Sequence, residues 1–410
     1  MDIFSFADIL LPREELMEKW AVIACDQFSS QPEYWRKAAE IAGDAPSALR
    51  LILPEAELGP DPSAQIRRID ETMLEYLQRG IFREYRDAFL YVERRLQNGM
   101  LRRGVVGKLD LERYDYGEKA STPVRATEKT VVERIPPRVK IRENAALELP
   151  HVLLLCDDER RAVIEALTRE KETLPKLYDF ELMEGGGRIE GRLVQGAAAE
   201  SLRRRLQEYE EETRRRLEGT GSEPVLYAVG DGNHSLATAK ACWEQRKARG
   251  ADPESDPARF ALVELENLRD ECQQFTPIHR ILRQTDPEAL LRDAEAEICA
   301  PGGRALPWIA GTREGVLYLD PGKGASPVGI LQDFLDRWLQ SHPGQIDYIH
   351  GDGALRAMAA EEGAVGFLLP AMDKAQLFRV ISAGGVLPRK TFSMGHATEK
   401  RYYVEARKIR

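Results

Sequence analysis

The stretch "PVLYAVGDGNHSLATAK", residues 224–240, contains three patterns in succession. Residues 224–229 form a short apolar run, which predicts a buried strand. Residues 236–249 are typical of a helix, and Gly250 is a typical residue for its end. A glycine-rich turn separates the two. Because further strand and helix patterns follow along the chain, the sequence predicts a mixed α/β or α+β fold.

The turn "GDGNHS", residues 230–235, lies where the predicted helix begins. The first amides of a helix have no partner within it and, with the helix dipole, attract anions. Gly230 and Gly232 let the backbone approach a phosphate and adopt positive φ. Asn233 or Ser235 is expected to cap the helix. His234 can donate a hydrogen bond to the anion or, if protonated, offer a positive charge.

Asp231 is the unusual member of this turn, because phosphate repels a carboxylate. It fits only if Mg²⁺ bridges the two groups or if it accepts a proton from a hydroxyl nucleophile. The alternative for the whole stretch is a plain tight turn, since Asp-Gly and Asn are common turn residues. The stretch has neither the Gly-Lys-Ser/Thr of a Walker A loop nor a Gly-x-Gly-x-x-Gly pattern. Both interpretations stay open.

The composition favours an ordinary protein surface. The 410 residues include 59 Lys+Arg and 68 Asp+Glu, giving a net charge of -9, which argues against general nucleic-acid binding. The five cysteines are widely spaced without a Cys-x-x-Cys pair, so the sequence suggests neither a disulfide framework nor a zinc site. No signal-peptide pattern or membrane-length apolar run occurs. We expect a cytoplasmic protein without nucleic-acid or membrane partners; the oligomeric state has no sequence signal.

Local patterns indicate several further elements. Ser30 and Glu33, with Pro32 between them, form a potential capping box. Residues 63–80 carry an apolar helical stripe. Asn-Gly at 98–99 and three glycines at 185–187 each predict a turn between two strands.

The order of these patterns predicts the domain organisation. We expect a core over residues 1–285, which begins with a helical segment. A new alternation of strands and helices indicates a smaller α/β lobe over residues 286–385. Residues 386–410 then return to the core and end in a strand.

The stretch "YAVGDGNHSLATAK", residues 227–240, resembles the signature of a bacterial and archaeal family, the thousand-and-fifteenth in the domain-of-unknown-function series. The usual signature is Ala-Asp-Gly-His-His-Arg-Tyr-Glu-Thr-Ala. The stretches "ACDQFSSQPEYW", "RATEKTVVERIPPR", "ALVELENLRDECQQFTPIHRIL" and "LPRKTFSMG" resemble the family too. That family is similar to the ParB/sulfiredoxin superfamily, in which a Gly-x-x-(His/Arg)-Arg box at a helix start binds nucleotide phosphates. One branch of the superfamily phosphorylates free serine. The resemblance implies a ParB/sulfiredoxin-like core.

The box departs from the family pattern at an important position. Asp231, Gly232 and His234 match it, and Asn233 replaces a histidine. Ser235 replaces the arginine that clamps phosphate. Either another basic residue supplies the charge or this branch has altered its chemistry.

One basic region can supply that charge. Residues 94–142 contain nine arginines and four lysines against six acids. Arg125, Arg134 and Arg138 are the candidates for phosphate contacts. The alternative is a solvated basic face that pairs with acidic helices.

The same region contains "RATEKT", residues 125–130, where the family usually has His-Glu-x-Thr. Glu128 and Thr130 match that pattern, and Thr127 replaces the histidine. The resembling serine kinases use a glutamate as the general base towards the substrate hydroxyl, which implies this role for Glu128 and a substrate contact for Thr130. The alternative is structural: Thr127 caps a short helix and Glu128 lies in its first turn.

Four other polar residues are candidates for substrate contacts. Asp26 and Gln27 follow an apolar run, where a chain leaves a sheet; Asp26 binds a substrate amine or Mg²⁺, or else caps the turn. The adjacent Cys25 lacks a local histidine and is expected to be a buried small residue. Arg280 in "FTPIHRIL" can reach phosphate. Lys390 belongs to "LPRKTFSMG", whose basic and hydroxyl side chains can bind an anion. The alternative is that this stretch is an exposed loop.

Two functions follow from these observations. The first is a nucleotide-dependent phosphotransferase that acts on a small hydroxyl compound, with free serine as the first compound to test. Its cofactors would be ATP or ADP with Mg²⁺. The alternative is a non-catalytic nucleotide- or phosphate-binding regulatory protein, which the absence of arginine at Ser235 favours.

Overall fold

The computed structural model describes residues 2–410 except 118–119, 217, 219–222, 325, 384–385 and 389. The chain forms two compact units. Unit 1 comprises residues 1–273, 378–385 and 395–410, and unit 2 comprises residues 274–377 and 386–394. The boundary lies between residues 273 and 274 rather than after residue 285, because the strand that begins at Phe275 pairs within the sheet of unit 2.

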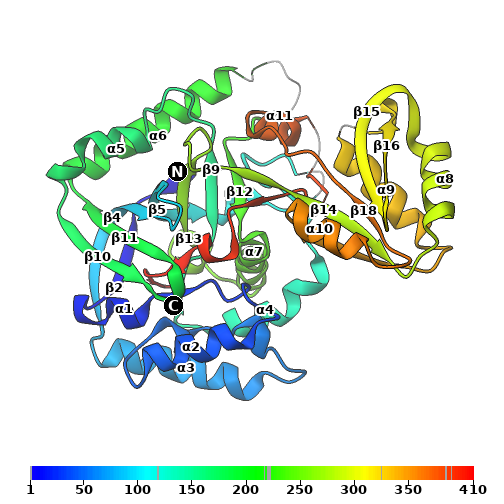
Figure 1. Cartoon of the computed structure of the whole chain (residues 1–410). Coiled ribbons are helices and arrows are strands. Elements are labelled where there is room, and N and C mark those ends of the chain that lie inside the picture. Colours follow the sequence, from blue (N-terminus) through cyan, green and yellow to red (C-terminus); the bar gives the residue numbers. More distant parts are fainter. Residues whose placement is uncertain are drawn as a thin grey trace. The chain divides into compact units, whose positions relative to one another are not determined.

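Unit 1 is built on an 11-stranded sheet, with helices on both faces (Figure 1). The strands of this sheet are β1 (Phe4–Ser5), β2 (Ala7–Pro12), β4 (Phe82–Arg95), β5 (Leu101–Asp110), β6 (Tyr114–Asp115), β7 (Val124–Ala126), β9 (Leu153–Cys156), β10 (Lys176–Leu182), β11 (Gly187–Val194), β12 (Tyr227–Asp231) and β13 (Phe260–Asn267). Two pairs of short strands form separate 2-stranded sheets: β3 (Val22–Ile23) with β20 (Tyr402–Tyr403), and β8 (Leu147–Glu148) with β21 (Arg407–Lys408). Its helices are α1 (Met17–Trp20), α2 (Pro32–Ala42), α3 (Ser63–Gln78), α4 (Ile135–Arg142), α5 (Ile164–Glu170), α6 (Ala197–Arg216), α7 (Asn233–Ala248) and, at the boundary with unit 2, α11 (Leu377–Ser382).

The strand directions at one side of this sheet bring several chain segments to the same edge. The order along the sheet is β10-β11-β4-β5-β13-β9-β12-β7-β6. β12 is parallel to β7 and antiparallel to β9. The carboxyl ends of β7 and β12 therefore lie at the same edge as the start of β9. Loops that follow two neighbouring parallel strands are a common position for ligand sites.

Alternating side chains of the long strand β4 build separate cores on the two faces of the sheet. Leu90 and Val92 belong to a core that includes side chains of α2 and α3. Phe89 and Tyr91 belong to a core that includes side chains of α5, α6 and α7. Full burial of each such side chain stabilises the fold by about 1.5–3 kcal/mol. The strand pattern in the sequence therefore fixes which face each helix covers.

Several local expectations can be compared with the structure. The helix at 63–80 and the hairpins around Gly99 and Gly185 are confirmed. The capping box is wrong: α2 begins at Pro32, and its N-cap Gln31 makes no side-chain cap. The expected last strand forms two short strands instead, β20 and β21.

Unit 2 contains a 6-stranded sheet with helices on both faces. Its strands are β14 (Phe275–Arg283), β15 (Cys299–Ala310), β16 (Arg313–Leu319), β17 (Gln345–His350), β18 (Val365–Phe367) and β19 (Phe392–Met394), and its helices are α8 (Pro287–Ile298), α9 (Pro327–Trp338) and α10 (Asp352–Ala359). Leu282 of β14 packs in the core with α8 and α9. Its neighbour Ile281 packs in a second core with α10.

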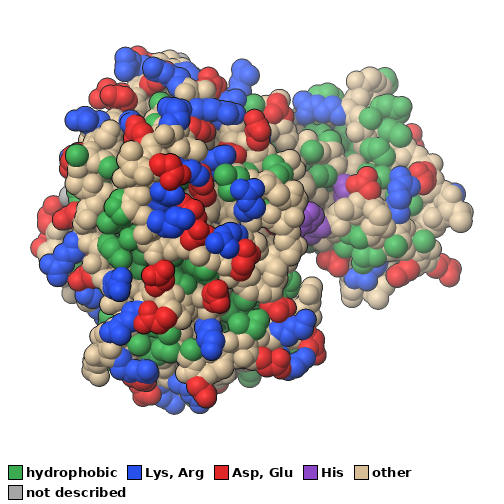
Figure 2. Space-filling view, turned by 60° about the vertical axis from the view of Figure 1, so that its left-hand side comes forward, with side chains coloured by type: hydrophobic (Ala, Val, Ile, Leu, Met, Phe, Trp, Pro, Cys, Tyr) green, Lys and Arg blue, Asp and Glu red, His purple; other side chains and the backbone are tan. Residues whose placement is uncertain are grey.

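The expected mixed α/β fold is confirmed. All five cysteines are free thiols, as their spacing predicts. None of the helices within the described residues is long and apolar enough to cross a bilayer. On the face drawn in Figure 2, Lys and Arg side chains are interspersed with Asp and Glu side chains.

Candidate functional site

The turn between β12 and α7 leaves the start of the helix without a side-chain cap. Gly232 is the N-cap of α7, with φ 79° and ψ 26°, and makes no side-chain cap. The expectation that Asn233 or Ser235 caps the helix is wrong, because both lie inside its first turn. Gly230 lies where the pairing of β12 with β9 is irregular. The first amides of α7 thus begin the helix without a side-chain acceptor at the N-cap.

Gly232 is also packed too closely for a side chain. A Cβ there would lie 3.0 Å from Val152 Cα and 3.3 Å from His151 Cδ2. Its positive φ adds a cost of about 1–2 kcal/mol for any L side chain. We expect Gly232→Ala to destabilise the protein by about 2 kcal/mol, measured by urea unfolding. Gly250→Ala is the control, because it has φ 92° but nothing within 4 Å; equal losses would mean that crowding at Gly232 contributes nothing.

The segment after β7 runs alongside this turn. Thr127 Oγ1 donates a hydrogen bond to the Val229 carbonyl at 2.7 Å. Val131 N–H donates to His234 Nε2 at 3.2 Å. Glu128, which is half-buried, lies between these two attachments. The alternative in which Thr127 caps a short helix is wrong, because Thr127 bonds to β12 and residues 127–131 form no helix.

Two polar atoms at this junction have no hydrogen-bond partner among the described residues. They are Thr130 Oγ1 and Asn233 Oδ1. Thr130 is only 6% exposed, so bulk water does not solvate its hydroxyl freely. A buried polar atom without a partner costs about 1–3 kcal/mol. Both atoms therefore favour a polar ligand or bound water at this place.

A lysine from the C-terminal segment faces the turn. Lys400 Nζ lies 3.1 Å from Asp231 Oδ2, and the two side chains are 12% and 25% exposed. Asp231 Oδ1 accepts a hydrogen bond from Gly232 N–H at 3.1 Å. Sequence reasoning missed Lys400, because only the pairing of β20 with β3 brings residue 400 to this edge. It is a cation close to the turn where the family's arginine is absent.

Asp26 and His151 complete the polar surroundings of the turn. Burial raises the pKa of Asp26, but His151, the Gln27 amide and Lys400 outweigh it and lower that pKa below its usual value. Gln27 Nε2 donates to Asp26 Oδ1 at 3.0 Å. Asp26 is therefore an ionised carboxylate. The neighbouring Cys25 is half-buried rather than fully buried as expected, and burial and Asp26 raise the pKa of its thiol to about 11.

A tyrosine contacts His151. Tyr403 Oη accepts a hydrogen bond from Cys25 N–H at 3.2 Å and lies 2.7 Å from His151 Nδ1. Burial, followed by the neighbouring Cys25, raises the pKa of Tyr403, so its hydroxyl stays protonated. Burial lowers the pKa of His151 against the opposing effect of Asp26 and Asp231. His151 is thus less readily protonated than a free imidazole, and it lowers the pKa of Asp26 only at a pH low enough to protonate it.

His234 is neutral as well. Burial, with smaller contributions from the positive charges of Arg138 and Arg134, lowers its pKa to about 4. Its Nε2 accepts from Val131 N–H, so Nδ1 carries the proton. Of the two expected roles, the lowered pKa disfavours that of a cation at neutral pH, and hydrogen-bond donation to an anion stays a prediction.

The depressed pKa makes stability depend on pH. The unfolded chain binds a proton at His234 near pH 6.5, whereas the folded chain does so near pH 4. Protonation of His234 therefore favours the unfolded chain below pH 6.5. The free energy of unfolding keeps its full value above pH 6.5 and decreases as the pH falls towards 4. After a discount for the partial exposure of His234, this decrease in the free energy of unfolding is about 1–2 kcal/mol. Urea unfolding should show that the advantage of the wild type over His234→Gln shrinks between pH 7 and 4.5; a constant difference would contradict this assignment.

The arginines of the basic region differ in availability. Arg134 is exposed, and Arg138 pairs with Glu55 while donating to the Arg134 carbonyl at 2.8 Å. Both lie close enough to influence His234. Arg125 instead donates to the backbone carbonyls of residues 122, 223 and 381. Its guanidinium is thus used for packing, contrary to the expected phosphate contact.

Arg280 and Lys390 belong to unit 2, where they contact each other. Arg280 is fully buried and donates to the Lys390 carbonyl at 3.0 Å and to Gln332 Oε1 at 2.8 Å. Both cations lie over the Tyr348 ring, at 4.5 and 5.1 Å from its centroid. These contacts give Arg280 a packing role in unit 2.

Within the described part of the chain, no group of three or more His, Cys, Asp or Glu side chains is arranged to hold a metal ion. Asp231 offers one carboxylate, and its two oxygens already contact Lys400 and Gly232 N–H. Mg²⁺ on nucleotides commonly takes most of its ligands from phosphates and water and only one or two from the protein.

Several solved structures align with much of the chain. SbnI with a C-terminal truncation, from Staphylococcus aureus, is 10% identical, covering 71% of this chain and 82% of that chain with a TM-score of 0.37. A free serine kinase mutant in complex with AMP is 12% identical, covering 72% and 89% with a TM-score of 0.38. A conserved hypothetical protein from Pyrococcus furiosus is 12% identical, covering 72% and 90% with a TM-score of 0.34. At such low values these similarities support no inference about what this chain binds.

No curated protein matches the chain. The family resemblance seen at the turn and in four other stretches is confirmed over almost the whole length, because one family model matches residues 3–406. The chain belongs to the DUF1015 family, proteins of unknown function.

Proposed function

We propose that unit 1 is a nucleotide-dependent phosphotransferase that acts on a small hydroxyl compound. One observation carries the proposal. The loop after β7 and the glycine turn after β12 are joined by the Thr127–Val229 and Val131–His234 hydrogen bonds, so a candidate base lies beside a candidate phosphate cradle. Phosphoryl transfer needs positioning, charge neutralisation and an acceptor for the hydroxyl proton.

The helix start would hold the nucleotide phosphates. The amides of Asn233, His234 and Ser235 belong to the uncapped first turn of α7. The Thr130 hydroxyl lacks a partner among the described residues and can donate to a phosphate oxygen. Neutral His234 can add a further donor without repelling a metal ion. Backbone and side-chain donors of this kind bind phosphate well at helix starts.

Lys400 would supply the positive charge that the missing arginine does not. It already neutralises Asp231, so the turn carries no net charge from this pair. Asp231 would hold Mg²⁺ together with the nucleotide phosphates, and the ion would neutralise charge on the transferred group. Arg134 and Arg138, whose charges reach His234, would add to the positive field.

Glu128 would accept the proton of the substrate hydroxyl. The hydroxyl oxygen then forms a bond to the terminal phosphorus of ATP or ADP, the bond to the bridging oxygen breaks, and ADP or AMP leaves. Ionised Asp26, positioned by Gln27, would bind an ammonium group of the substrate. Free serine carries both the hydroxyl and the ammonium group, so it is the first compound to test.

A non-catalytic nucleotide- or phosphate-binding regulatory protein is the second candidate. The observation that favours it is the pairing of the nearby cations. Lys400 contacts Asp231, and Arg138 contacts Glu55. A site with its charges already balanced can bind a nucleotide without stabilising the transferring group.

The test incubates the full chain with Mg²⁺ and either ATP or ADP, together with free serine and a panel of small hydroxyl compounds. Phosphorus NMR detects transfer, and calorimetry measures nucleotide binding. We expect a phosphorylated product with serine or a related amino alcohol. Tight binding without any product supports the regulatory function, and no binding of either nucleotide contradicts both the phosphotransferase and a nucleotide-binding regulator.

A further inference from the structure

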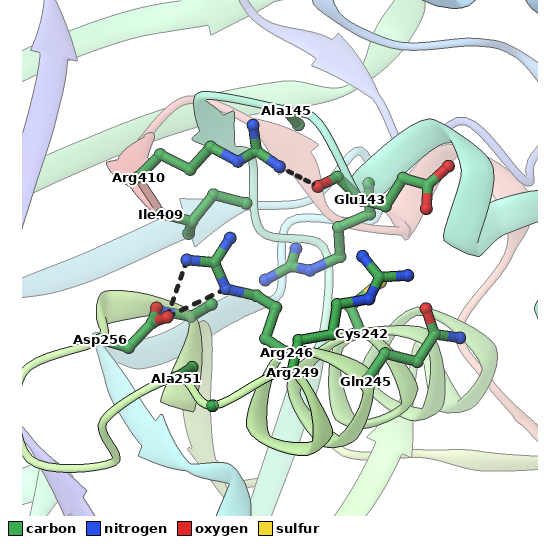
Figure 3. Close-up of a pocket in the computed structure, with 13 residues that line it drawn as sticks. Glu143, Ala145, Cys242, Gln245, Arg246, Arg249, Ala251, Asp256, Ile409 and Arg410 are labelled. Carbon is green, nitrogen blue, oxygen red and sulfur yellow. Dashed lines mark hydrogen bonds and ion pairs between the residues drawn. The ribbon is translucent and has the colours of Figure 1, made fainter.

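A second group of cations lies at the opposite end of α7. Arg246 and Arg249 are in or directly after its last turn, Arg142 ends α4, and Arg410 comes from the C-terminal segment. All four line a cavity of about 350 Å³ in unit 1 (Figure 3). Because α7 has 16 residues, its ends are about 24 Å apart, so this cavity is separate from the glycine turn.

Two of these arginines already have carboxylate partners. Arg246 donates to Asp256 Oδ2 through Nε at 3.0 Å and through Nη2 at 2.7 Å, as Figure 3 shows. Arg142 pairs with the buried Glu148. These pairs hold the two guanidinium groups in place and neutralise them.

The other two form no ion pair with a described residue, although the charge of Arg410 partly offsets the burial that raises the pKa of Asp70. Arg410 donates to the Glu143 carbonyl, drawn as a dashed line in Figure 3, and to Asn144 Oδ1 at 3.2 Å. Arg249 forms no ion pair with any described residue. The dipole of α7 favours a cation at its end, which accounts for Arg249. It does not account for Arg410, which reaches the same cavity from another segment.

We propose that this cavity binds a small molecule with at least two phosphate or carboxylate groups. Arg249 and Arg410 would each bind one anionic group, because the planar guanidinium matches the oxygens of both group types. Gln245 adds a neutral hydrogen-bonding side chain, and Ile409 with the buried Cys242 adds an apolar wall. The volume falls in the range of metabolite sites. The site does not depend on the proposed phosphotransferase activity.

The test titrates the full chain by calorimetry with inorganic pyrophosphate and, separately, with citrate, to distinguish a phosphate ligand from a carboxylate ligand. The variants are Arg249→Gln and Arg410→Gln. Arg204→Gln is the matched control, because Arg204 is an exposed arginine of α6 outside the cavity. Thr130→Val reports any binding at the glycine turn instead.

We expect at least one probe to bind and each cavity variant to weaken it about tenfold or more, since a charge-assisted contact is lost. Arg204→Gln and Thr130→Val should leave that affinity unchanged. The probe that binds more tightly then identifies the ligand as a phosphate or a carboxylate compound. Failure of both probes to bind would overturn the proposal, and so would binding that only Thr130→Val weakens. The loss of either arginine changes no contact at the glycine turn, so a failure here leaves the phosphotransferase proposal intact.

Discussion

Replacement of Glu128 by glutamine is expected to lower the turnover number of the proposed phosphoryl transfer by a factor of about 10²–10⁴, because a general base contributes an acceleration of this size. Glutamine keeps the shape of the side chain but cannot take the hydroxyl proton. Nucleotide affinity should change less than about threefold, since the phosphate donors belong to the turn and to Thr130. Steady-state kinetics and calorimetry measure the two effects separately.

The matched control is Glu133→Gln. Glu133 is an exposed glutamate a few residues further along the same segment. It should leave both turnover and affinity close to those of the wild type. Equal turnover of wild type and Glu128→Gln would remove Glu128 from the mechanism. Equal losses of turnover and affinity would make it a binding residue instead.

Replacement of Lys400 by methionine is expected to have the second large effect. It leaves the partly buried Asp231 carboxylate without its cation, which costs about 2 kcal/mol of folding free energy after allowance for partial exposure. It also removes the cation assigned to the nucleotide phosphates, so affinity should fall about tenfold or more. Urea unfolding and nucleotide titration measure these effects.

A second substitution separates the two roles of Lys400. In Lys400→Met combined with Asp231→Asn, neither charge remains, so stability should return to within about 1 kcal/mol of the wild type. Nucleotide affinity, titrated without Mg²⁺ so that the loss of Asp231 as a metal contact does not enter, should stay weak. Lys408→Met is the control, because Lys408 pairs with Glu84 at the surface, where the loss should be below about 1 kcal/mol. Recovery of nucleotide binding in the double variant would show that Lys400 serves only to neutralise Asp231.

The fold was predictable from the sequence where local patterns decide it. The strand, turn and helix around Gly232 follow from apolar periodicity and from the glycine's freedom of φ. The capping box at residues 30–33 failed, because proline at the first helical position sufficed to begin α2. The domain boundary failed because β14 finds its partners in unit 2, and strand partners far along the chain leave no local signal.

The candidate site was predictable only where local sequence motifs mark its segments. The Glu128 segment and the glycine turn follow neighbouring parallel strands, and the sequence motifs identified both segments. Lys400 was missed, because its place beside the turn depends on the pairing of β20 with β3. His151 was missed, because it precedes β9, whose start lies beside the end of β12 only through their antiparallel pairing. Arg125 was misjudged, since composition indicates that a region is basic but not which of its arginines bond to carbonyls.

The most direct measurement is a crystal structure of the full chain grown with ADP and Mg²⁺. We expect the phosphate oxygens to lie within hydrogen-bond distance of the amides of residues 233–235 and of the Thr130 hydroxyl, with the Lys400 ammonium group close to a phosphate. A nucleotide bound with its phosphates elsewhere, while the turn stays closed against Val152 and His151, would contradict the proposed site.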